Sequence, residues 1–293
     1  MNKYKIGIIG IGMVGTPLKR WFEEGGHRRK ESLFLYDKDP AKGFSDDINE
    51  ADIIFICVPS PRLSDGSADI SIVNNALEGI QNGRIVVIKS TVPPGTTEEF
   101  QKKYPQHKIL FSPEFLTEKT SWSDFINPDR QLVGWTVESR DTAKDVLGLL
   151  PRAELMSPSS GLDVNATEAE IIKYAANVFL ARKVTFANAI HGLAEYHQVN
   201  FDNIREAVGA DSRIGHSHLD VHHGGYQGYG GYCFVKDTDA LIAHLEKCGL
   251  SEAAALFHRD RKFNEAVLAI QGLTPEDVSV HDHEWVSAKL DKK

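Results

Sequence analysis

One of the three cysteines in this sequence stands where chemistry could occur. Cys233 lies in the glycine-rich stretch "GYGGYCFVKDTDAL", which runs from Gly228 to Leu241. A structural cysteine favours an apolar strand or helix, which is the setting that Cys57 has in "IIFICVP". A cysteine that reacts with a substrate needs backbone that packs closely around that substrate, and surroundings that favour the thiolate. The stretch by itself leaves both interpretations open.

A lysine and an amide share one face of a long expected helix. The segment "TEAEIIKYAANVFLARKVTFANAIHGLAEYHQV" has no Gly or Pro before Gly192, and Lys173 and Asn177 are spaced i, i+4 in it. On a buried face, the pair would suit the stabilisation of an oxyanion. On an exposed face, Lys173 would extend into solvent and Asn177 would bond to local backbone. The segment alone favours the exposed interpretation.

The N-terminal segment "KIGIIGIGMVGTPLKRWFEEGG" places a glycine turn between an apolar strand and a helix. Gly10 permits the tight turn, Gly12 lets the backbone approach a pyrophosphate, and Gly15 allows close packing of helix and strand. The pyrophosphate then lies at the helix N-terminus, where unpaired N–H groups favour anions. This strand–turn–helix context predicts a dinucleotide site.

An acid follows the second expected strand, "SLFLYD". Asp37 lies about twenty residues beyond the turn, where a carboxylate accepts hydrogen bonds from the ribose of NAD and repels the extra phosphate of NADP. We therefore expect NAD as the cofactor. Lys38 and Lys42 follow closely, so we expect the discrimination against NADP to be incomplete.

Four further apolar stretches read as buried strands: "ADIIFICVP", "GRIVVIKST", "HKILFSP" and "RQLVGW". Helix-like segments such as "DISIVNNALEGIQ" separate the first of them. Near-continuous Val/Ile strands that alternate with helices are typical of a parallel sheet covered on both faces. The predicted fold is α/β, a Rossmann-type doubly wound parallel sheet, followed by an all-α central domain.

Polar turns follow three of these strands: "VPSPRLSDGSADIS", "KSTVPPGTT" and "SPEFLTE". Ligands of open α/β sheets bind outside the carboxyl ends of the strands. The side chains left to face cofactor and substrate there are Ser60, Ser90, Thr91, Glu114 and Glu118. One such residue alone would more often be ordinary turn chemistry, but the shared location of the set favours a site.

Composition limits the class of protein. A formal net charge of −8 over 293 residues argues against a general nucleic-acid or anionic-membrane binder. Three cysteines without a CxxC spacing favour a cytoplasmic location, and no apolar run is long enough to span a membrane. The histidine-rich stretch from His216 to His223 is interpreted as a polar loop, and we expect no metal site.

Several stretches occur in one order between residue 6 and about residue 241: "GIIGIGMVG", "VPSPRLSDGSADIS", "KSTVPPGTT", "SPEFLTEKTSWSDFINPDRQLVG", "EIIKYAANVFLARKVTFANAI", "DSRIG" and "GYGGYCFVKDTDAL". As a set they are far more specific than the glycine turn. The set resembles the UDP-glucose/GDP-mannose dehydrogenase family. The resemblance implies a two-step, four-electron, NAD-dependent oxidation of a nucleotide-sugar primary alcohol, such as that of UDP-glucose, to the uronic acid used in polysaccharide biosynthesis.

The resemblance also assigns roles to residues. Cys233 matches the family nucleophile, which forms a thioester, and Lys173, Asn177 and Asp237 match residues that support the reaction there. Glu114 and Thr91 match residues that position water and assist proton transfer. The cofactor set comprises Gly10, Ile11, Gly12, Met13, Val14, Gly15, Asp37, Lys42, Pro59, Ser60, Ser90, Thr91 and Glu118. The substrate set comprises Arg213 and the substrate-binding backbone of Phe115, Leu116 and the glycine loop from Gly224 to Gly230, which contains Tyr229 and Gly230.

Two features depart from the family pattern. Val235 stands in "CFVKD" where the family usually has proline, which implies a small backbone adjustment. The family also continues into a second α/β domain that closes over the nucleotide, whereas here "LFHRDRKFNEAVLAIQGL" is followed by a polar tail. We therefore expect low or undetectable activity on UDP-glucose for this chain alone. The sequence leaves open whether a separate polypeptide, as a partner, supplies a UDP-binding domain.

The expected organisation has three parts: an NAD-binding domain over residues 1–156, a helical central domain with the cysteine loop over 157–275, and a tail over 276–293. The apolar helix from about Thr167 to Leu193 predicts a homodimer, in which Arg213 reaches the partner's site, as the resemblance implies. The alternatives are a compact dehydrogenase of a smaller sugar or hydroxy acid, and a non-catalytic NAD-binding protein.

Overall fold

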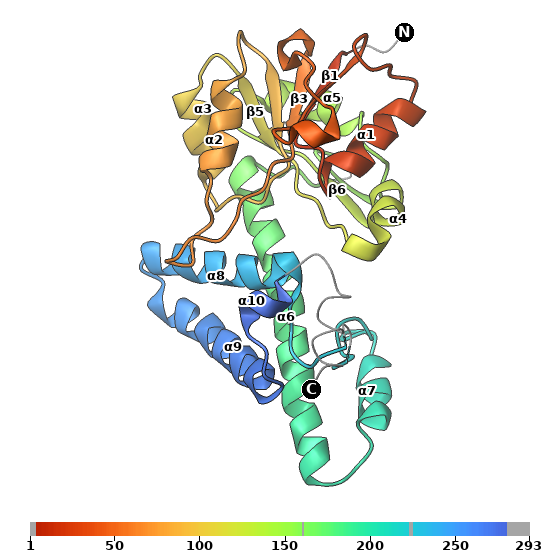
Figure 1. The fold of residues 1–293 in the computed structure, drawn as a ribbon, viewed down its shortest axis with the longest axis vertical. Helices are drawn as coiled ribbons and strands as arrows, with labels where there is room; N and C mark the ends of the chain where they lie inside the picture. The colour runs from red at the N-terminus through yellow and green to blue at the C-terminus, as the bar shows by residue number, and fades with distance from the viewer. Residues whose placement is uncertain (1–3, 160, 223–224, 280–293) are drawn as a thin grey trace. The chain divides into compact units, whose positions relative to one another are not determined.

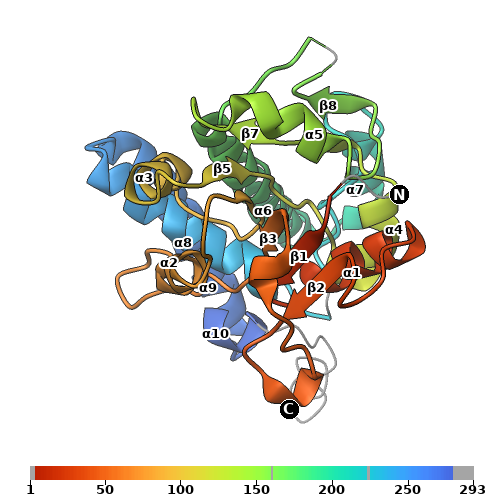
Figure 2. The ribbon, with the colours of Figure 1, turned by 90° about the horizontal axis from the view of Figure 1, so that it is seen from above.

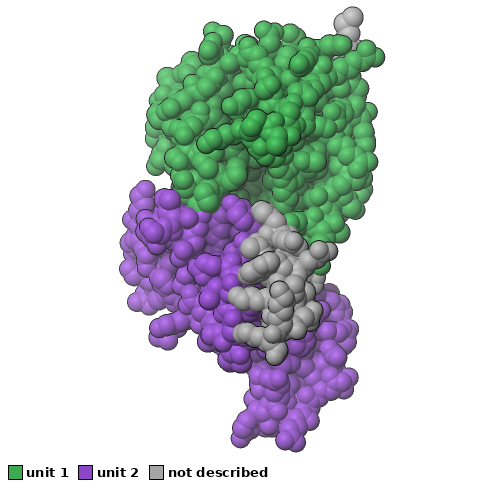
Figure 3. Space-filling model, viewed as in Figure 1, with its two compact units in different colours: residues 1–61, 69–173 green, residues 62–68, 174–293 purple. Residues whose placement is uncertain are grey.

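The computed structural model describes residues 4–159, 161–222 and 225–279. The chain divides into two compact units, one of residues 1–61 and 69–173 and the other of residues 62–68 and 174–293 (Figure 3). Each unit is considered below by itself. In the described part of the chain, no helix combines the length and the apolar character that crossing a membrane requires.

The first unit is built on a β-sheet (Figure 1). The sheet has six strands in the order β2-β1-β3-β4-β5-β7. Five strands are parallel: β1 (Ile6–Ile9), β2 (Leu33–Tyr36), β3 (Ile53–Ile56), β4 (Ile85–Ile88) and β5 (Lys108–Phe111). Because β1 leads to β2 on one side and β3 lies on its other side, the strand order reverses between β1 and β3. Ligands of such sheets bind at this switch point. The predicted doubly wound, Rossmann-type fold is confirmed.

Helices cover both faces of the sheet, as Figure 2 shows. α1 (Gly15–Glu24), α4 (Ser121–Ile126) and α5 (Ala143–Leu147) contribute to one core, and α2 (Ser71–Glu78), α3 (Thr96–Lys103) and the start of α6 contribute to the other. In β3, Ile53 and Phe55 join the first core, whereas Ile54 and Ile56 join the second. Burial of both faces explains why the strands read as continuous apolar runs.

The stretch "RQLVGW" forms two short strands, so its prediction as one strand of a parallel sheet is wrong. β6 (Arg130–Leu132) pairs with β8 (Leu155–Ser157) in a separate sheet, and β7 (Gly134–Trp135) runs antiparallel to β5. Val133 between them donates its N–H to the Ser157 carbonyl at 2.9 Å. A Cβ on Gly134 would lie 2.6 Å from the Asn165 carbonyl oxygen, so only glycine lets this edge approach α6 so closely.

The helix α6 (Ala166–Tyr196) is longer than the predicted span from Thr167 to Leu193. A reciprocal capping box starts it: Asn165 Oδ1 accepts from Glu168 N at 2.9 Å, and Glu168 Oε2 accepts from Asn165 N at 2.7 Å. Two residues after Glu168, the buried Glu170 accepts from Gly95 N at 2.6 Å and from Thr97 N at 2.8 Å. These bonds connect α6 to the start of α3.

The second unit is helical and contains most of α6, with α7 (Phe201–Gly209), α8 (Gly231–Lys247), α9 (Ser251–Ile270) and α10 (Pro275–Val278). α9 starts earlier than the predicted segment, which began at Leu256. The segment 62–68 also belongs to this unit, because Ala68 packs against Tyr174 and Ala240. Short 3₁₀ helices complete the first unit: η1 (Pro40–Lys42), η2 (Ile48–Glu50), η3 (Glu118–Thr120) and η4 (Arg140–Thr142).

Candidate active site

The glycine turn after β1 has the geometry that a dinucleotide needs. Gly10 has φ +91°, and a Cβ there would lie 2.7 Å from the Cys57 carbonyl oxygen. A Cβ on Gly15 would lie 2.0 Å from the Gly10 carbonyl oxygen, so strand and helix touch there. At Gly12, a Cβ would meet no atom within 4 Å, which leaves the backbone open to a phosphate group. Ile11, Met13 and Val14 complete the turn into α1.

Asp37 follows β2 and is joined to the glycine turn. Its Oδ2 accepts from Ile11 N at 2.7 Å and from Lys42 Nζ at 2.9 Å, and its Oδ1 accepts from Asp39 N at 2.9 Å. Burial raises the pKa of Asp37, but the hydrogen bonds from Asp39, Lys42 and Ile11 outweigh this and lower it. The carboxylate is therefore ionised and partly neutralised by Lys42.

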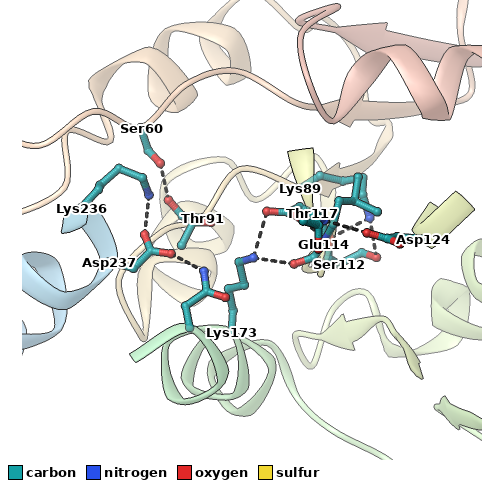
Figure 4. A network of polar contacts seen from close by, with 12 residues as sticks. Ser60, Lys89, Thr91, Ser112, Glu114, Thr117, Asp124, Lys173, Lys236 and Asp237 are labelled. Carbon is teal, nitrogen blue, oxygen red and sulfur yellow. Dashed lines mark hydrogen bonds and ion pairs between the residues drawn. The ribbon is translucent and has the colours of Figure 1, made fainter. Parts of the chain in front are cut away.

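The polar side chains after β3 and β4 are engaged with backbone. Ser60 is buried and its Oγ donates to the Thr91 carbonyl at 2.6 Å (Figure 4). The Ser90 Oγ donates to the Val58 carbonyl at 2.7 Å. These bonds join the ends of β3 and β4 beside the switch point. Pro59 is exposed and Thr91 is half-buried. The predicted contacts of these residues with the cofactor remain predictions.

Glu114, which follows β5, forms a buried ion pair with Lys173 on α6. Lys173 Nζ donates to Glu114 Oε1 at 2.9 Å and to the Glu114 carbonyl at 2.6 Å (Figure 4). Glu114 Oε2 also accepts from Leu116 N at 2.7 Å. Lys173 is only 2% exposed, so the interpretation that it extends into solvent is excluded. The pair belongs entirely to the first unit.

A cavity of about 250 Å³ lies beside this ion pair. Its walls include Glu114, Phe115, Leu116 and Arg130. The Arg130 guanidinium lies 3.8 Å from the centre of the Phe115 ring, and Lys173 Nζ lies 5.5 Å from it. Cation–π contacts therefore hold the ring of Phe115, whose backbone the resemblance assigns to substrate binding. Glu118, at the start of η3, is half-buried.

In the second unit, Asp237 on α8 is fully buried between two donors. Asn177 Nδ2 donates to Asp237 Oδ2 at 2.6 Å, and Lys236 Nζ donates to Asp237 Oδ1 at 2.5 Å (Figure 4). Asn177 is 8% exposed and reaches across to α8, so it does not make the local backbone bond considered from the sequence. Asn177 lies one helical turn after Lys173 on α6.

Cys233 lies within the first turn of α8, whereas the sequence suggested a bend ahead of a helix. It is half-buried. Lys236, one turn further along α8, is buried; burial alone would lower its pKa, but the charges of Asp237 and of a Cys233 thiolate raise it. By the same attraction, Lys236 and the N-terminal end of the helix dipole favour the thiolate form of Cys233.

The glycine loop before α8 is held by α9. Tyr229 N donates to Asn264 Oδ1 at 2.7 Å, and Asn264 Nδ2 donates to the Tyr229 carbonyl at 3.0 Å. The Tyr229 side chain packs in a core with Ala181 and Val235, so this residue can offer a substrate only its backbone. A Cβ on Gly230 would lie 2.1 Å from the Tyr226 hydroxyl, so glycine is required there.

The remaining predicted residues lie apart from these groups or outside the described residues. The Arg213 side chain is 87% exposed and pairs with Asp211, two residues before it, with Nη2 at 2.6 Å from Asp211 Oδ2. His223 and Gly224 lie outside the described residues. Within residues 4–159, 161–222 and 225–279, no cluster of three or more His, Cys, Asp or Glu side chains is placed to hold a metal ion.

Three charged residues at these sites had no role assigned from the sequence. Lys89 is buried under the Glu114 turn, Arg130 stacks on Phe115, and Lys236 lies beside Cys233. The sequence contained an indication that Lys89 is buried: it directly follows the apolar run "IVVI", with no other polar residue between them. Nothing in the local sequence marks Arg130, because its aromatic partner lies on another segment.

Comparison with known proteins follows the same division of the chain. Residues 39–147 match the NAD binding domain of the UDP-glucose/GDP-mannose dehydrogenase family, and residues 167–266 match the central domain of that family. The glycine turn, the switch point and the acid after β2 define a dinucleotide-binding domain of the Rossmann type.

Relatives agree with this assignment. A UDP-glucose 6-dehydrogenase of Rhizobium meliloti (strain 1021) is 34% identical over 283 residues, which cover 81% of this chain and 62% of that protein. A UDP-glucose 6-dehydrogenase of Pseudomonas aeruginosa is 36% identical over 285 residues, with coverage of 83% and 61%. The structure of a UDP-glucose dehydrogenase from Pyrobaculum islandicum superimposes with a TM-score of 0.76 at 31% identity, covering 89% of this chain and 68% of that one.

The chain belongs to the UDP-glucose/GDP-mannose dehydrogenase family. The cofactor of the matched N-terminal domain is NAD. Gly12 and the Asp37 carboxylate fit this cofactor, because the first leaves room for a pyrophosphate and the second provides an acceptor for the ribose. The chain spans only 62% and 61% of the length of the two dehydrogenases compared above.

Proposed function

We propose that this protein takes part in the NAD-dependent oxidation of the primary alcohol of a UDP-sugar, of the UDP-glucose type, to the acid. The observation that carries the proposal is the position of Cys233 in the first turn of α8, with buried Lys236 and Asp237 one turn further along. A thiol there is set up as a nucleophile. A simple hydroxyacid oxidation has no need of one.

The proposed chemistry uses Cys233 in the second half of the reaction. Oxidation of the alcohol gives an aldehyde, to which the Cys233 thiolate adds to form a thiohemiacetal. Loss of a hydride from that adduct gives a thioester, and water releases the acid and regenerates the thiol. NAD, when bound, accepts the hydride in each of the two oxidations.

The polar pairs support this chemistry. We assign Asn177 and Asp237 to the reaction at Cys233, where Asn177 provides an amide donor for the oxyanion of the adduct. We assign Glu114 and Thr91 to the positioning of water and to proton transfer. We assign Lys173, whose ammonium group binds the Glu114 carboxylate, to support of the reaction at Cys233. Burial strengthens these electrostatic interactions because little water screens them.

We further propose a homodimer, supported by one face of α6. Four large apolar or aromatic side chains on it are exposed, Phe179 (62%), Phe186 (53%), Leu193 (54%) and Tyr196 (82%), and we call them the α6 stripe. The first three recur every seven residues, which is the spacing of a helix–helix seam. A second copy of the chain is the proposed occupant, with Arg213 reaching the partner's site.

The test of the reaction is replacement of the proposed nucleophile. Acid formation from UDP-glucose by Cys233→Ala should fall by a factor on the order of 10³ or more, because no thioester can form. Unfolding temperature and NAD affinity should stay unchanged. The matched control is Cys248→Ser, because this exposed cysteine lies just beyond the other end of α8 and should be dispensable.

Three results would contradict the proposal in different ways. Acid formation by Cys233→Ala near the wild-type rate would exclude covalent catalysis at this residue. Turnover of a hydroxy acid that survives the same substitution would favour a simple dehydrogenase. NAD binding without NADH formation from any UDP- or GDP-sugar would identify a non-catalytic NAD-binding protein.

A further inference from the structure

Lys89, the residue after β4, is a buried charge that the proposed reaction does not use. The residue is 3% exposed, and its Nζ donates to the Ser112 carbonyl at 2.9 Å and to the Ser112 Oγ at 3.1 Å (Figure 4). It also contributes to the wall of the cavity beside Glu114. An ammonium group so deeply buried destabilises the fold unless nearby charges offset its desolvation.

The ionisable groups that act on Lys89 come from three elements. Cys57 follows β3, Glu114 follows β5, and Lys173 lies on α6. Burial raises the pKa of the Cys57 thiol to about 12, so Cys57 is neutral near pH 7. Of the two charged neighbours, Lys173 repels Lys89 and Glu114 attracts it. The Glu114 carboxylate is therefore the anion that supports a charged Lys89.

Lys89 and Lys173 hold the same short turn at its two ends. Lys89 binds Ser112, and Lys173 binds both the carboxylate and the carbonyl of Glu114, two residues further on. Leu116 N then fixes the second oxygen of Glu114. A substitution of Lys89 therefore affects Glu114 in two ways: it removes the bonds to Ser112, two residues before Glu114, and it removes a positive charge that acts on the Glu114 carboxylate.

We propose that Lys89 is a positioning residue: its ammonium group anchors the turn from Ser112 to Glu114 and keeps the Glu114 carboxylate oriented toward Lys173. Its effect on turnover rests on the proposed function. The charge coupling between Lys89 and Glu114 does not, because all the groups lie in the first unit.

The proposal has a pH signature. Burial lowers the pKa of Lys89 to about 8, with smaller effects from Cys57, Glu114 and Lys173. Lys89 is therefore charged below pH 8 and neutral above it. The neutral amine still donates hydrogen bonds to Ser112, so the anchor persists at high pH while the charge is lost.

The first experiment measures the ratio of kcat for the wild type to kcat for Lys89→Met with UDP-glucose at several pH values. The ratio should be about tenfold near pH 7 and fall to about threefold or less above pH 9, because only the wild type loses a charge over that range. KM should change less than kcat. A ratio that does not vary with pH would overturn the proposal.

Two variants separate charge from packing. Lys89→Arg keeps the positive charge at every pH, so it should restore most of kcat below pH 8. Asp46→Asn alters another buried charge of the first unit, whose carboxylate accepts from Leu35 N and pairs with Arg29. Burial raises the pKa of Asp46, but these bonds outweigh it and lower the pKa, so this carboxylate is ionised over the whole pH range. The variant should therefore give a ratio to wild type that is constant with pH. A pH-dependent ratio like that of Lys89→Met would show that any buried charge has this effect and would overturn the proposal.

A second experiment needs no turnover. Carboxyl-¹³C glutamate labelling lets the Glu114 signal be assigned as the one missing in Glu114→Gln. In the wild type, the chemical shift of this signal should change in one step as the pH passes through about 8, where Lys89 loses its proton. In Lys89→Met this step should be absent. If Glu114 does not sense this step, the proposal fails. Absence of turnover together with a normal step would contradict the proposed function alone.

Discussion

Burial decides what the individual polar residues of this protein can do. Lys173, Asn177 and Asp237 all lie at positions with less than a tenth of their surface exposed, and each has a specific polar partner. Unpaired polar groups at this depth would cost several kcal/mol each, so the hydrogen bonds fix side-chain geometry as well as stability. Such preorganised pairs suit electrostatic catalysis, in which donors must be in place before charge develops.

Cofactor choice is a prediction at this scale. The carboxylate of Asp37 should make NADP bind at least about tenfold more weakly than NAD, because the extra phosphate meets a negative charge. Asp37→Ala should narrow the difference. Lys42→Met should widen it, since Lys42 Nζ lies 2.9 Å from Asp37 Oδ2 and partly neutralises it. Dissociation constants for NADH and NADPH, measured by fluorescence, test all three statements.

Equal or tighter binding of NADP by the wild type would contradict the role of Asp37. The stronger criterion is that Asp37→Ala and Lys42→Met change the ratio of the two dissociation constants in opposite directions. General damage to the site would weaken the binding of both cofactors to the same extent and leave the ratio unchanged. A surface lysine without such a contact, Lys102 on α3, provides the control variant Lys102→Met.

At the scale of elements, helix starts carry the reactive groups. α1 begins at the glycine turn, where Val14 occupies the N-cap position and provides no side-chain cap. α8 begins at Gly230 and Gly231, also without a side-chain cap, and presents Cys233 in its first turn. In both helices the positive end of the helix dipole is therefore left without a side-chain cap, at positions where the proposed function places a negative charge, a pyrophosphate in one case and a thiolate in the other.

The α6 stripe gives a prediction for assembly. Phe186→Asp would place a charge in the proposed seam and should weaken the dimer by about 2 kcal/mol or more. Light scattering should then report a mass close to the 32.5 kDa of one chain, whereas the wild type should give twice that value. Val137→Asp, on an exposed apolar residue of the first unit, is the matched control and should leave the mass unchanged.

A wild-type mass of one chain at working concentration would refute the dimer. A dimer that persists in Phe186→Asp would place the interface elsewhere on the surface. In that case a second aspartate at Phe179, one heptad away, should have no effect on the mass either.

At the scale of the whole molecule, the chain alternates between its two units. It leaves the first unit at Pro61, returns at Asp69, and leaves again after Lys173 within α6. The segment 62–68 is anchored in the second unit by Arg62, which pairs with the buried carboxylate of Asp239 on α8; Arg261 on α9 pairs with the same carboxylate. Within the second unit, Arg62 is thus fixed to α8, the helix that carries Cys233.

NAD should stabilise the first unit in particular. Three of the four tryptophans, Trp21, Trp122 and Trp135, belong to that unit, and Trp285 lies outside the described residues. In a Trp285→Phe variant, tryptophan fluorescence would therefore report on the first unit alone. At a concentration about 100 times its dissociation constant, NAD should stabilise this unit by about 2.7 kcal/mol and raise its melting temperature.

The same measurement with Gly12→Val provides the control, because a branched side chain would occupy the open space at the turn. No shift with NAD in the wild-type background would contradict cofactor binding at this site. A shift in Gly12→Val equal to that of the wild-type background would place the cofactor elsewhere.

Much of the architecture was determined by the sequence alone. The glycine turn, the apolar strands and the long helix were predictable because turn chemistry and hydrophobic periodicity act over a few residues. The ordered set of family motifs identified the family, which the comparisons confirm. The parallel arrangement followed from strands that are apolar on both faces.

Only the tertiary structure decided which polar residues are buried and which residues they contact. From α6 alone, Lys173 would extend into solvent, but the turn after β5 covers it and supplies Glu114. "RQLVGW" reads as one strand, yet its first residues pair with β8 and its last with β5, in two different sheets. Lys89 looks like the end of a strand until Ser112 is placed beside it. These outcomes depend on segments distant in sequence, and a local pattern carries no information about what packs against it.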